Sequence, residues 1–169
     1  MMKSLFYAFF ICVALFITNN ALSDETVSFD GCEFAVTFPI PFEFTPIQVL
    51  GVRSTIAITS SKDGLPILRA ECQPLLKGAK ASDELILSSL EEQARSIGLS
   101  NVQVTIQKTE VGTVGTFFGK KNAGGFEMAQ MGKLYVGNRS ILNLLSTELL
   151  SEFPSKKTNQ FFGSVKRLQ

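Results

Sequence analysis

The sequence predicts an α+β fold: a single domain with an antiparallel β-sheet of about six strands, packed by one long central helix and a C-terminal helix. Three observations support this prediction. Several runs alternate apolar and polar residues with the period of a half-buried strand. One long amphipathic stretch interrupts these runs, and Asp-Gly, Gly-Gly and Gly-Asn pairs separate them as in hairpins. Residues 24–169 alone are long enough to form one domain with its own core.

Residues 1–23 have the pattern of a secretory signal peptide. Lys3 precedes the apolar run Leu5–Ile17, and small residues stand three and one positions before a cut after Ser23. This run of roughly 13 residues is shorter than the roughly 20 that a membrane-spanning helix needs. We therefore expect cleavage near Ser23 and a secreted or periplasmic chain 24–169 without a transmembrane span. The alternative is an uncleaved N-terminal anchor.

The charge balance argues against two classes of partner. Lys3 is the only charged residue among the first 23, so residues 24–169 contain 15 basic and 15 acidic side chains. A formal net charge of zero gives no bulk attraction to nucleic acid or to an anionic membrane surface. We therefore expect no nucleic-acid partner.

The cysteines predict one disulfide. Cys12 lies in the apolar run of the signal, so Cys32 and Cys72 are the two cysteines of the exported chain. Closing a loop of about 41 residues would contribute roughly 4 kcal/mol in the chain-entropy model. The alternative, a redox-active pair of thiols, lacks the Cys-x-x-Cys spacing that is typical of such pairs.

The first expected strand is Val27–Pro39, in which alternate residues face one side. Its apolar face would contain Cys32, Phe34, Val36 and Phe38, and its other face Glu33, Ala35 and Thr37. Three prolines between Pro39 and Pro46 then predict a connection and not a strand centre. Phe42 and Phe44 in this connection would either cover an edge of the core or form an exposed aromatic strip for binding.

A hairpin follows this connection. Leu50–Thr59 alternates apolar and polar residues, and Ser60–Gly64 ends in an Asp-Gly turn signal. The next run, Ile67–Gln73, should return antiparallel to the first and bring Cys72 back toward Cys32.

The clearest helix is predicted over Asp83–Ile97. Ser82 is the expected N-cap, acidic residues occupy the first turn, and Gly98 stands just beyond the end. The stripe expected to face the sheet contains Ile86, Leu90, Ala94 and Ile97.

The second half of the sheet is expected to be a meander. A strand at 102–107 leads to strands around 114–118, 126–136 and 139–146, with glycine-containing turns between the last three. After these strands we expect a short helix at Thr147–Phe153, a break at Pro154 and a final helix at Thr158–Leu168.

The composition excludes several kinds of active site. The chain contains no histidine, which rules out Ser-His-Asp, Cys-His and His-zinc chemistry. The glycines between Gly112 and Gly125 match neither the P-loop nor the dinucleotide-binding fingerprint. We therefore expect no cofactor, no metal and no enzyme activity, although sites built only from Ser-Lys or paired carboxylates remain open.

Three weaker features remain. The first is a basic patch that would bind a partner or a small anion, or else form an ordinary solvated loop: Lys120, Lys121, Lys133 and Arg139. The second is the pair Met128 and Met131, which are either adaptable contacts or core residues. The third is a glycosylation sequon at Asn138, which matters only in a eukaryotic source.

Two short motifs stand near the ends of the predicted domain: FAVTFP at residues 34–39 and QFFGSV at residues 160–165. Together with the order of the elements, they resemble the PsbP-like proteins, a group that includes extrinsic photosystem subunits and a Ran-binding import factor. The resemblance implies an α/β/α sandwich around an antiparallel sheet, in proteins that mostly bind partners and carry out no chemistry. It assigns no functional residue, because no site motif of that group is present.

These observations favour an exported, non-catalytic binding or assembly accessory domain whose partner is another envelope or secreted protein. The alternative function is a carrier of a small hydrophobic ligand. Its pocket would lie between the sheet and a helix and would use the 11 phenylalanines of residues 24–169.

Overall fold

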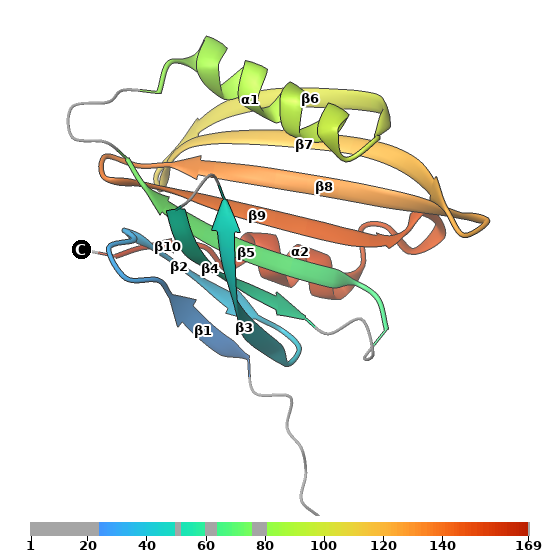
Figure 1. Cartoon of the computed structure of the whole chain (residues 1–169), viewed down its shortest axis with the longest axis horizontal. Coiled ribbons are helices and arrows are strands. Elements are labelled where there is room, and N and C mark those ends of the chain that lie inside the picture. Colours follow the sequence, from blue (N-terminus) through green and yellow to red (C-terminus); the bar gives the residue numbers. More distant parts are fainter. Residues whose placement is uncertain (1–23, 50–51, 60–63, 76–80, 169) are drawn as a thin grey trace, which may run out of the picture.

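The computed structural model describes residues 24–49, 52–59, 64–75 and 81–168. These residues form ten strands in two antiparallel sheets, two α-helices and one 3-10 helix (Figure 1). The prediction of an α+β domain is confirmed. The prediction of about six strands in one sheet is wrong, because the chain folds back on itself more often than its turn signals show.

The large sheet has seven strands in the order β3-β4-β5-β9-β8-β7-β6, and every neighbouring pair is antiparallel. Its strands are β3 (Phe42–Val49), β4 (Val52–Thr59), β5 (Ile67–Pro74), β6 (Ser100–Thr109), β7 (Gly112–Ala123), β8 (Phe126–Val136) and β9 (Ser140–Leu149). The predicted hairpin of β4 with β5 is confirmed, and so is the meander from β6 to β9. The turn predicted at 60–63 lies outside the described residues.

The small sheet has three strands in the order β1-β2-β10: β1 (Glu25–Ser28), β2 (Phe34–Phe38) and β10 (Lys166–Arg167). The prediction of one strand over Val27–Pro39 is therefore wrong. A turn at Gly31, whose φ of +74° favours glycine, folds β1 back onto β2. Ala35, expected on the outer face, is buried as well.

The long helix α1 (Asp83–Ser96) begins where the sequence predicts and ends one residue before the predicted end at Ile97. The Ser82 Oγ accepts a 3.3 Å hydrogen bond from the backbone N–H of Leu85, so the predicted N-cap is confirmed. Gly98 follows the helix with a φ of +73°. The helix lies across β6, β7 and part of β8 on one face of the large sheet.

The second helix, α2 (Lys156–Gly163), and the small sheet cover the other face of the large sheet (Figure 1). The predicted helix over Thr158–Leu168 is wrong at its end, because Lys166 and Arg167 pair with β2 instead. The core between these layers includes Phe34, Phe38 and Phe161, all fully buried.

Two further predictions are corrected. The α-helix predicted over Thr147–Phe153 does not form: its first three residues continue β9 to Leu149, and the next three form the 3-10 helix η2 (Leu150–Glu152). The proline-rich connection is also a strand, β3. Pro46 fits there because β3 is an edge strand, where a missing N–H leaves no neighbour unpaired. No helix among the described residues has the length and apolar character needed to cross a bilayer.

Candidate functional site

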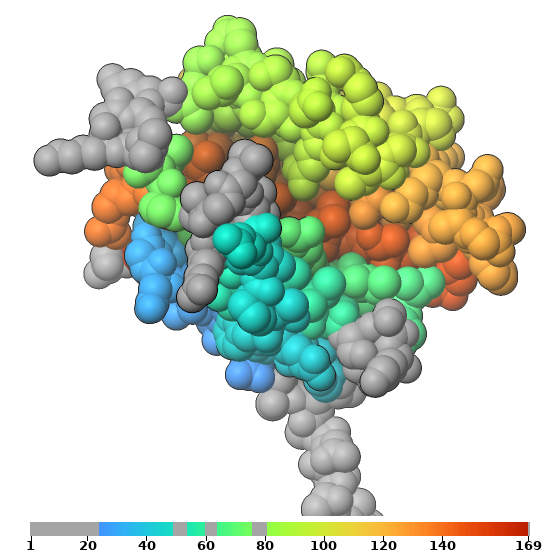
Figure 2. All heavy atoms as spheres, viewed as in Figure 1, coloured from blue at the N-terminus to red at the C-terminus, as the bar shows by residue number. Residues whose placement is uncertain are grey.

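Beside α1, the large sheet has a face that no other helix or strand of the described residues covers. The helix covers only the β6–β8 half of this face, and the face continues across β9, β5 and β4. In Figure 2 it forms a shallow trough, with atoms of β8 and β9 at its floor between α1 and the β4–β5 region. The trough is defined here by six residues on this face: Ile58, Arg69, Glu71, Gln130, Asn143 and Leu145.

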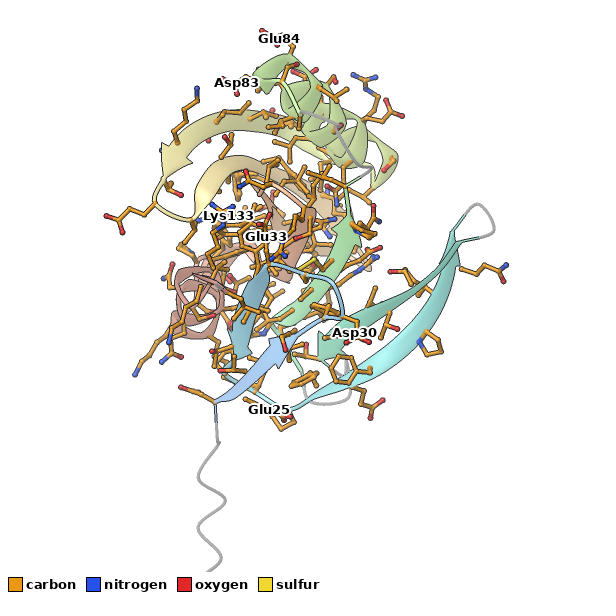
Figure 3. All side chains as sticks on the ribbon, turned by 90° about the vertical axis from the view of Figure 1, so that its left-hand side faces the viewer. Glu25, Asp30, Glu33, Asp83, Glu84 and Lys133 are labelled. Carbon is orange, nitrogen blue, oxygen red and sulfur yellow. A yellow bond between two sulfur atoms is a disulfide. The ribbon has the colours of Figure 1, made fainter. Side chains whose placement is uncertain are left out.

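The strand register brings these residues together. Arg69 in β5 lies opposite Ile58 in β4 and Leu145 in β9. Glu71 lies opposite Asn143 in β9. Because opposite residues of antiparallel strands share a face, and Leu145 packs in the cluster under α1, all of them lie on the helix side of the sheet. Figure 3 shows the β3–β4 hairpin projecting from the sheet on this side.

The centre of the trough is an ion pair. The Arg69 Nη2 lies 2.8 Å from the Glu71 Oε2, and the Gln73 Nε2 donates a 2.9 Å hydrogen bond to the Glu71 Oε1. Glu71 is buried, whereas the Arg69 side chain keeps 36% of its surface exposed. A guanidinium has five N–H donors, so Arg69 can bind a further acceptor without leaving Glu71.

The floor of the trough contains two hydrogen-bond acceptors without partners in the described part of the chain. The Asn143 Oδ1 and the Gln130 Oε1 are both buried and accept no hydrogen bond there. The Gln130 amide is held in place because its Nε2 donates a 2.9 Å bond to the Thr147 Oγ1. Leaving such a group unpaired costs about 1–3 kcal/mol, so the floor favours a ligand that brings N–H or O–H donors.

Half-buried apolar side chains, Ile58 and Leu145, flank Arg69 on its two neighbouring strands. The trough therefore combines an exposed guanidinium, two free acceptors and an apolar border, which suits an amphipathic ligand. Among the residues that the structure describes, no group of three or more Asp, Glu and Cys side chains gathers as a metal site would require.

The trough was not singled out from the sequence. Its signal is weak but present, because the predicted strand Ile67–Gln73 alternates Leu68, Ala70 and Cys72 with polar residues. A strand with one solvent-exposed face shows the same alternation. Only the register of β5 with β9 shows that polar side chains from several strands meet here.

The four residues of the predicted basic patch lie at separate places. Lys120 and Lys121 are consecutive in β7, so their side chains point to opposite faces of the sheet. Lys133 shares the α2 side with Lys120, and its Nζ lies 5.2 Å from the centre of the Phe162 ring. Arg139 lies beyond the other end of β8. Burial lowers the pKa of Lys133. Anion binding by these residues stays a prediction.

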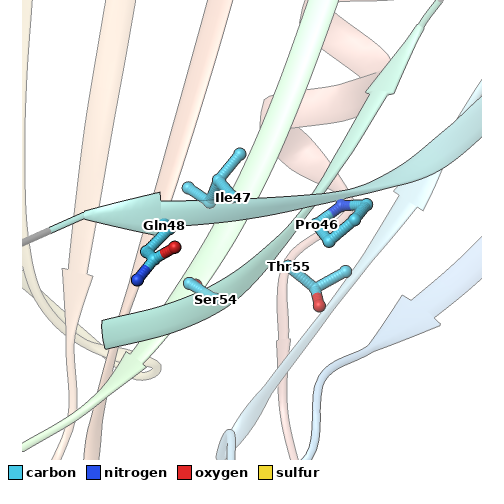
Figure 4. A pocket seen from close by; sticks show the side chains of 5 residues that line it. All are labelled: Pro46, Ile47, Gln48, Ser54 and Thr55. Atoms are coloured by element: carbon cyan, nitrogen blue, oxygen red, sulfur yellow. The ribbon is translucent and has the colours of Figure 1, made fainter. Parts of the chain in front are cut away.

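The two aromatics of β3 differ in role. Phe42 stacks on Phe38 with ring centres 4.5 Å apart, and therefore covers an edge of the core. Phe44 is 56% exposed and meets Phe42 edge to face at 5.4 Å. Further along this hairpin lies a shallow depression of about 420 Å³ (Figure 4), lined by Pro46, Ile47, Gln48, Ser54 and Thr55.

The contact between α1 and β7 is filled by side chains. A Cβ atom placed on Gly115 would lie 2.6 Å from the Leu90 Cδ1 and 2.7 Å from the Ile86 Cγ2. The helix therefore packs directly on the backbone of β7. At this contact there is no space for the hydrophobic pocket that the carrier hypothesis would place between the sheet and a helix.

The predicted disulfide is confirmed. Cys32 and Cys72 are bonded, with Cα atoms 6.1 Å apart, and the bond joins the segment before β2 to β5. Beside it lies Glu33, which was expected on the outer face of a strand but is 3% exposed. Gly137 lies against it, and any larger residue at that position would collide with the Glu33 carboxylate.

Glu33, labelled in Figure 3, holds two distant segments. Its Oε1 accepts a 3.0 Å bond from the Arg139 N–H, and its Oε2 lies 3.1 Å from the Arg167 Nη2. Burial by itself would raise the pKa of Glu33, but the hydrogen bonds and the Arg167 charge outweigh it, and the pKa is lowered. Glu33 is thus a structural carboxylate that ties β10 and the β8–β9 turn to β2.

Comparison with known proteins agrees on the fold. No family model and no curated protein matches the sequence. PsbP (CyanoP) of Synechocystis sp. PCC 6803 matches with a TM-score of 0.57 at 8% identity, over 89% of this chain and 95% of that one. LpqN, described as involved in cell envelope biogenesis of Mycobacterium tuberculosis, matches with a TM-score of 0.52 at 13% identity, over 93% and 97%.

A third structure, from Bacteroides thetaiotaomicron VPI-5482, matches with a TM-score of 0.52 at 9% identity. The match covers 86% of this chain and 49% of that one, so this chain spans about half the length of that protein. At such identities the likeness concerns the fold. The chain therefore has a PsbP-like fold, as the resemblance in its sequence implies.

Proposed function

We propose that this chain is an exported, non-catalytic binding or assembly accessory domain, and that it binds a segment of another envelope or secreted protein in the trough. The signal-like N-terminal sequence and the Cys32–Cys72 disulfide support export, since structural disulfides are typical of oxidising compartments. The likeness to LpqN, described as involved in cell envelope biogenesis, supports the same setting.

The observation that carries the proposal is the pair of unpartnered acceptors, the Asn143 Oδ1 and the Gln130 Oε1, on the same sheet face as Arg69. An extended peptide offers backbone N–H donors to such acceptors, a carbonyl or carboxylate to Arg69, and apolar side chains to Ile58 and Leu145. Each of these hydrogen bonds would contribute about 1 kcal/mol net.

The residues of the trough also favour a non-catalytic role. Glu71 is the buried carboxylate of the trough, and both of its oxygens are already bonded, to Arg69 and Gln73. A carboxylate held in this way is a poor general base, and the chain has no histidine to replace it.

The test is a comparative capture from the envelope or secreted fraction of the native cells, with quantitative mass spectrometry. The double variant Arg69→Gln/Glu71→Gln removes both charges of the trough without leaving one of them unpaired. Glu152→Gln/Lys156→Gln is the matched control, since it removes one acid and one base that are both exposed and lie outside the trough.

We expect the wild type and the control to recover the same protein, and the trough variant to lose most of it while keeping its thermal unfolding transition. Equal recovery by all three forms would show that the trough is not the binding site. Recovery of no specific protein by the wild type would overturn the proposed function itself.

A further inference from the structure

The large sheet has two edge strands, β3 and β6, and they differ in how they are protected. Natural edge strands resist pairing with other chains through proline, charge or bulges. β3 contains Pro46, which has no N–H to offer, and Glu43. In β6 the bulge between Ser100 and Gln103 and the charge of Lys108 lie only toward its two ends.

The centre of β6, residues 102–107, is unprotected. It contains no charge and no proline, and four of its six residues are β-branched. Along its outer side no strand of the described chain pairs with it. Short segments with this composition on an open edge readily pair with another strand, so a soluble chain needs something to cover them.

A groove of about 390 Å³ runs beside this edge, between α1 and β6. Its apolar lining comes from Leu87 on the helix and from Leu99, Val102 and Val104, and Val102 is 38% exposed. Glu91 and Arg95 lie one and two helical turns after Leu87 on the same side of α1. A strand added to β6 would close the open side of this groove.

We infer that β6 pairs antiparallel with β6 of a second copy of this chain, about a two-fold axis perpendicular to the sheet. With Val104 on the axis, Val102 lies opposite the partner's Ile106 and Gln103 opposite the partner's Thr105. With Thr105 on the axis, Val104 lies opposite the partner's Ile106. With Val104 on the axis, apolar residues meet apolar ones on the α1 side and polar residues meet polar ones on the other; with Thr105 on the axis, Val104 still meets Ile106, but Val102 lies opposite the partner's Lys108.

The charges on α1 are complementary under the same symmetry. The two-fold axis places both helices on one side of the joined sheet, running in opposite directions. Where the axis passes level with the turn between Glu91 and Arg95, the row of Leu87, Glu91 and Arg95 on one helix faces the same row reversed, and each Arg95 comes toward the partner's Glu91. Arg95 is free to do this, because its pairing with Glu92 is long, at 3.6 Å, and both side chains are 75% exposed.

The experiment is sedimentation analysis of the protein as recovered from expressing cells, over a range of micromolar concentrations. The wild type should be a dimer. Thr105→Lys adds a charge at the centre of the shared edge and should weaken the dimer at least about tenfold. Thr45→Lys, the same change at an exposed threonine in the middle of β3, should leave the dimer intact.

A second readout uses cysteine cross-linking. Val104→Cys or Thr105→Cys should form a disulfide-linked dimer on oxidation, and the variant that does so identifies the residue on the axis. A wild type that stays monomeric, a dimer that Thr45→Lys dissociates and Thr105→Lys does not, or a dimer that neither cysteine cross-links would each overturn the inference. Because the trough lies on other strands, none of these results depends on partner binding there.

Discussion

The hydroxyl group of Tyr135 in β8 donates a 2.9 Å hydrogen bond to the backbone carbonyl of Phe162 in α2. Both residues are buried, and the Tyr135 ring also lies 6.3 Å from the Phe34 ring of the small sheet. Tyr135 therefore joins the large sheet to both α2 and the small sheet. Burial raises the pKa of Tyr135 to about 12, so the hydroxyl stays neutral and remains a donor.

Replacing Tyr135 with phenylalanine should lower the free energy of unfolding by about 1–2 kcal/mol. The ring contacts are retained, but the Phe162 carbonyl loses its partner in a buried place. Urea unfolding followed by circular dichroism measures the change. A variant as stable as the wild type would show that water replaces the hydroxyl, or that this bond contributes nothing.

The ionisation of Tyr135 gives a prediction for high pH. In a chain cleaved after Ser23 it would be the only tyrosine, because the other is Tyr7. Its absorbance should change near pH 12 in the folded protein and near pH 10 in denaturant. The pKa of Tyr135 is higher in the folded state than in the unfolded state. Its neutral, buried side chain therefore contributes fully to the stability of the fold below about pH 10, and this contribution is lost between about pH 10 and pH 12. Ionisation near pH 10 in the native state would contradict the buried position.

Replacing Glu33 with glutamine should lower the free energy of unfolding by about 2–3 kcal/mol at neutral pH, since Arg167 and the Arg139 N–H lose a charged acceptor. The pKa of Glu33 is lowered in the folded state. The ionised Glu33 side chain therefore stabilises the fold fully above pH 4.5, its ordinary pKa, and this stabilisation is lost as the pH falls below that value. The difference in the free energy of unfolding between the wild type and Glu33→Gln should therefore become smaller in acid. Glu43→Gln, at an exposed position, is the control and should change stability by less than about 0.5 kcal/mol.

Reduction of the Cys32–Cys72 disulfide, or Cys72→Ser, should lower the thermal midpoint by about 10 °C. The expected loss is roughly 4 kcal/mol, because the closed loop spans a sequence separation of 40 residues. Calorimetry with and without reductant measures it. The serine variant should be insensitive to reductant as a monomer, and two free thiols in the exported wild type would contradict the bond.

Gly115→Ala should destabilise the protein by about 1–2 kcal/mol, since the added methyl group meets the ends of Leu90 and Ile86. Gly163→Ala is the matched control. Gly163 ends α2 and has no atom within 4 Å of the position of a new Cβ, so alanine there should be neutral or slightly stabilising. Equal effects at the two sites would show that α1 does not pack tightly on β7.

Local signals in the sequence were enough for some elements. The ends of α1 were predicted to within one residue because its cap, Ser82, and its terminating residue, Gly98, act within one turn of the backbone. The disulfide was predicted because only two cysteines remain after the signal and the β4–β5 hairpin returns the second one.

Other features depend on residues far apart in the chain, and no local pattern contains them. Lys166 and Arg167 look like the last turn of a helix until they pair with β2. The trough requires the register of β5 against β9, which places Glu71 opposite Asn143. Glu33 was misplaced because a buried carboxylate is recognisable only once its partner, Arg167, is known.

The ion pair between Glu33 and Arg167 joins residues that are 134 positions apart in the chain. A ribosome adding about 5–20 residues per second needs roughly 7 to 27 s to cover that distance. During this interval the β2 edge that later pairs with β10 is unoccupied, and the growing chain cannot complete its small sheet. Closure of the small sheet therefore waits for synthesis of the segment around residue 167, however early β1 and β2 have formed.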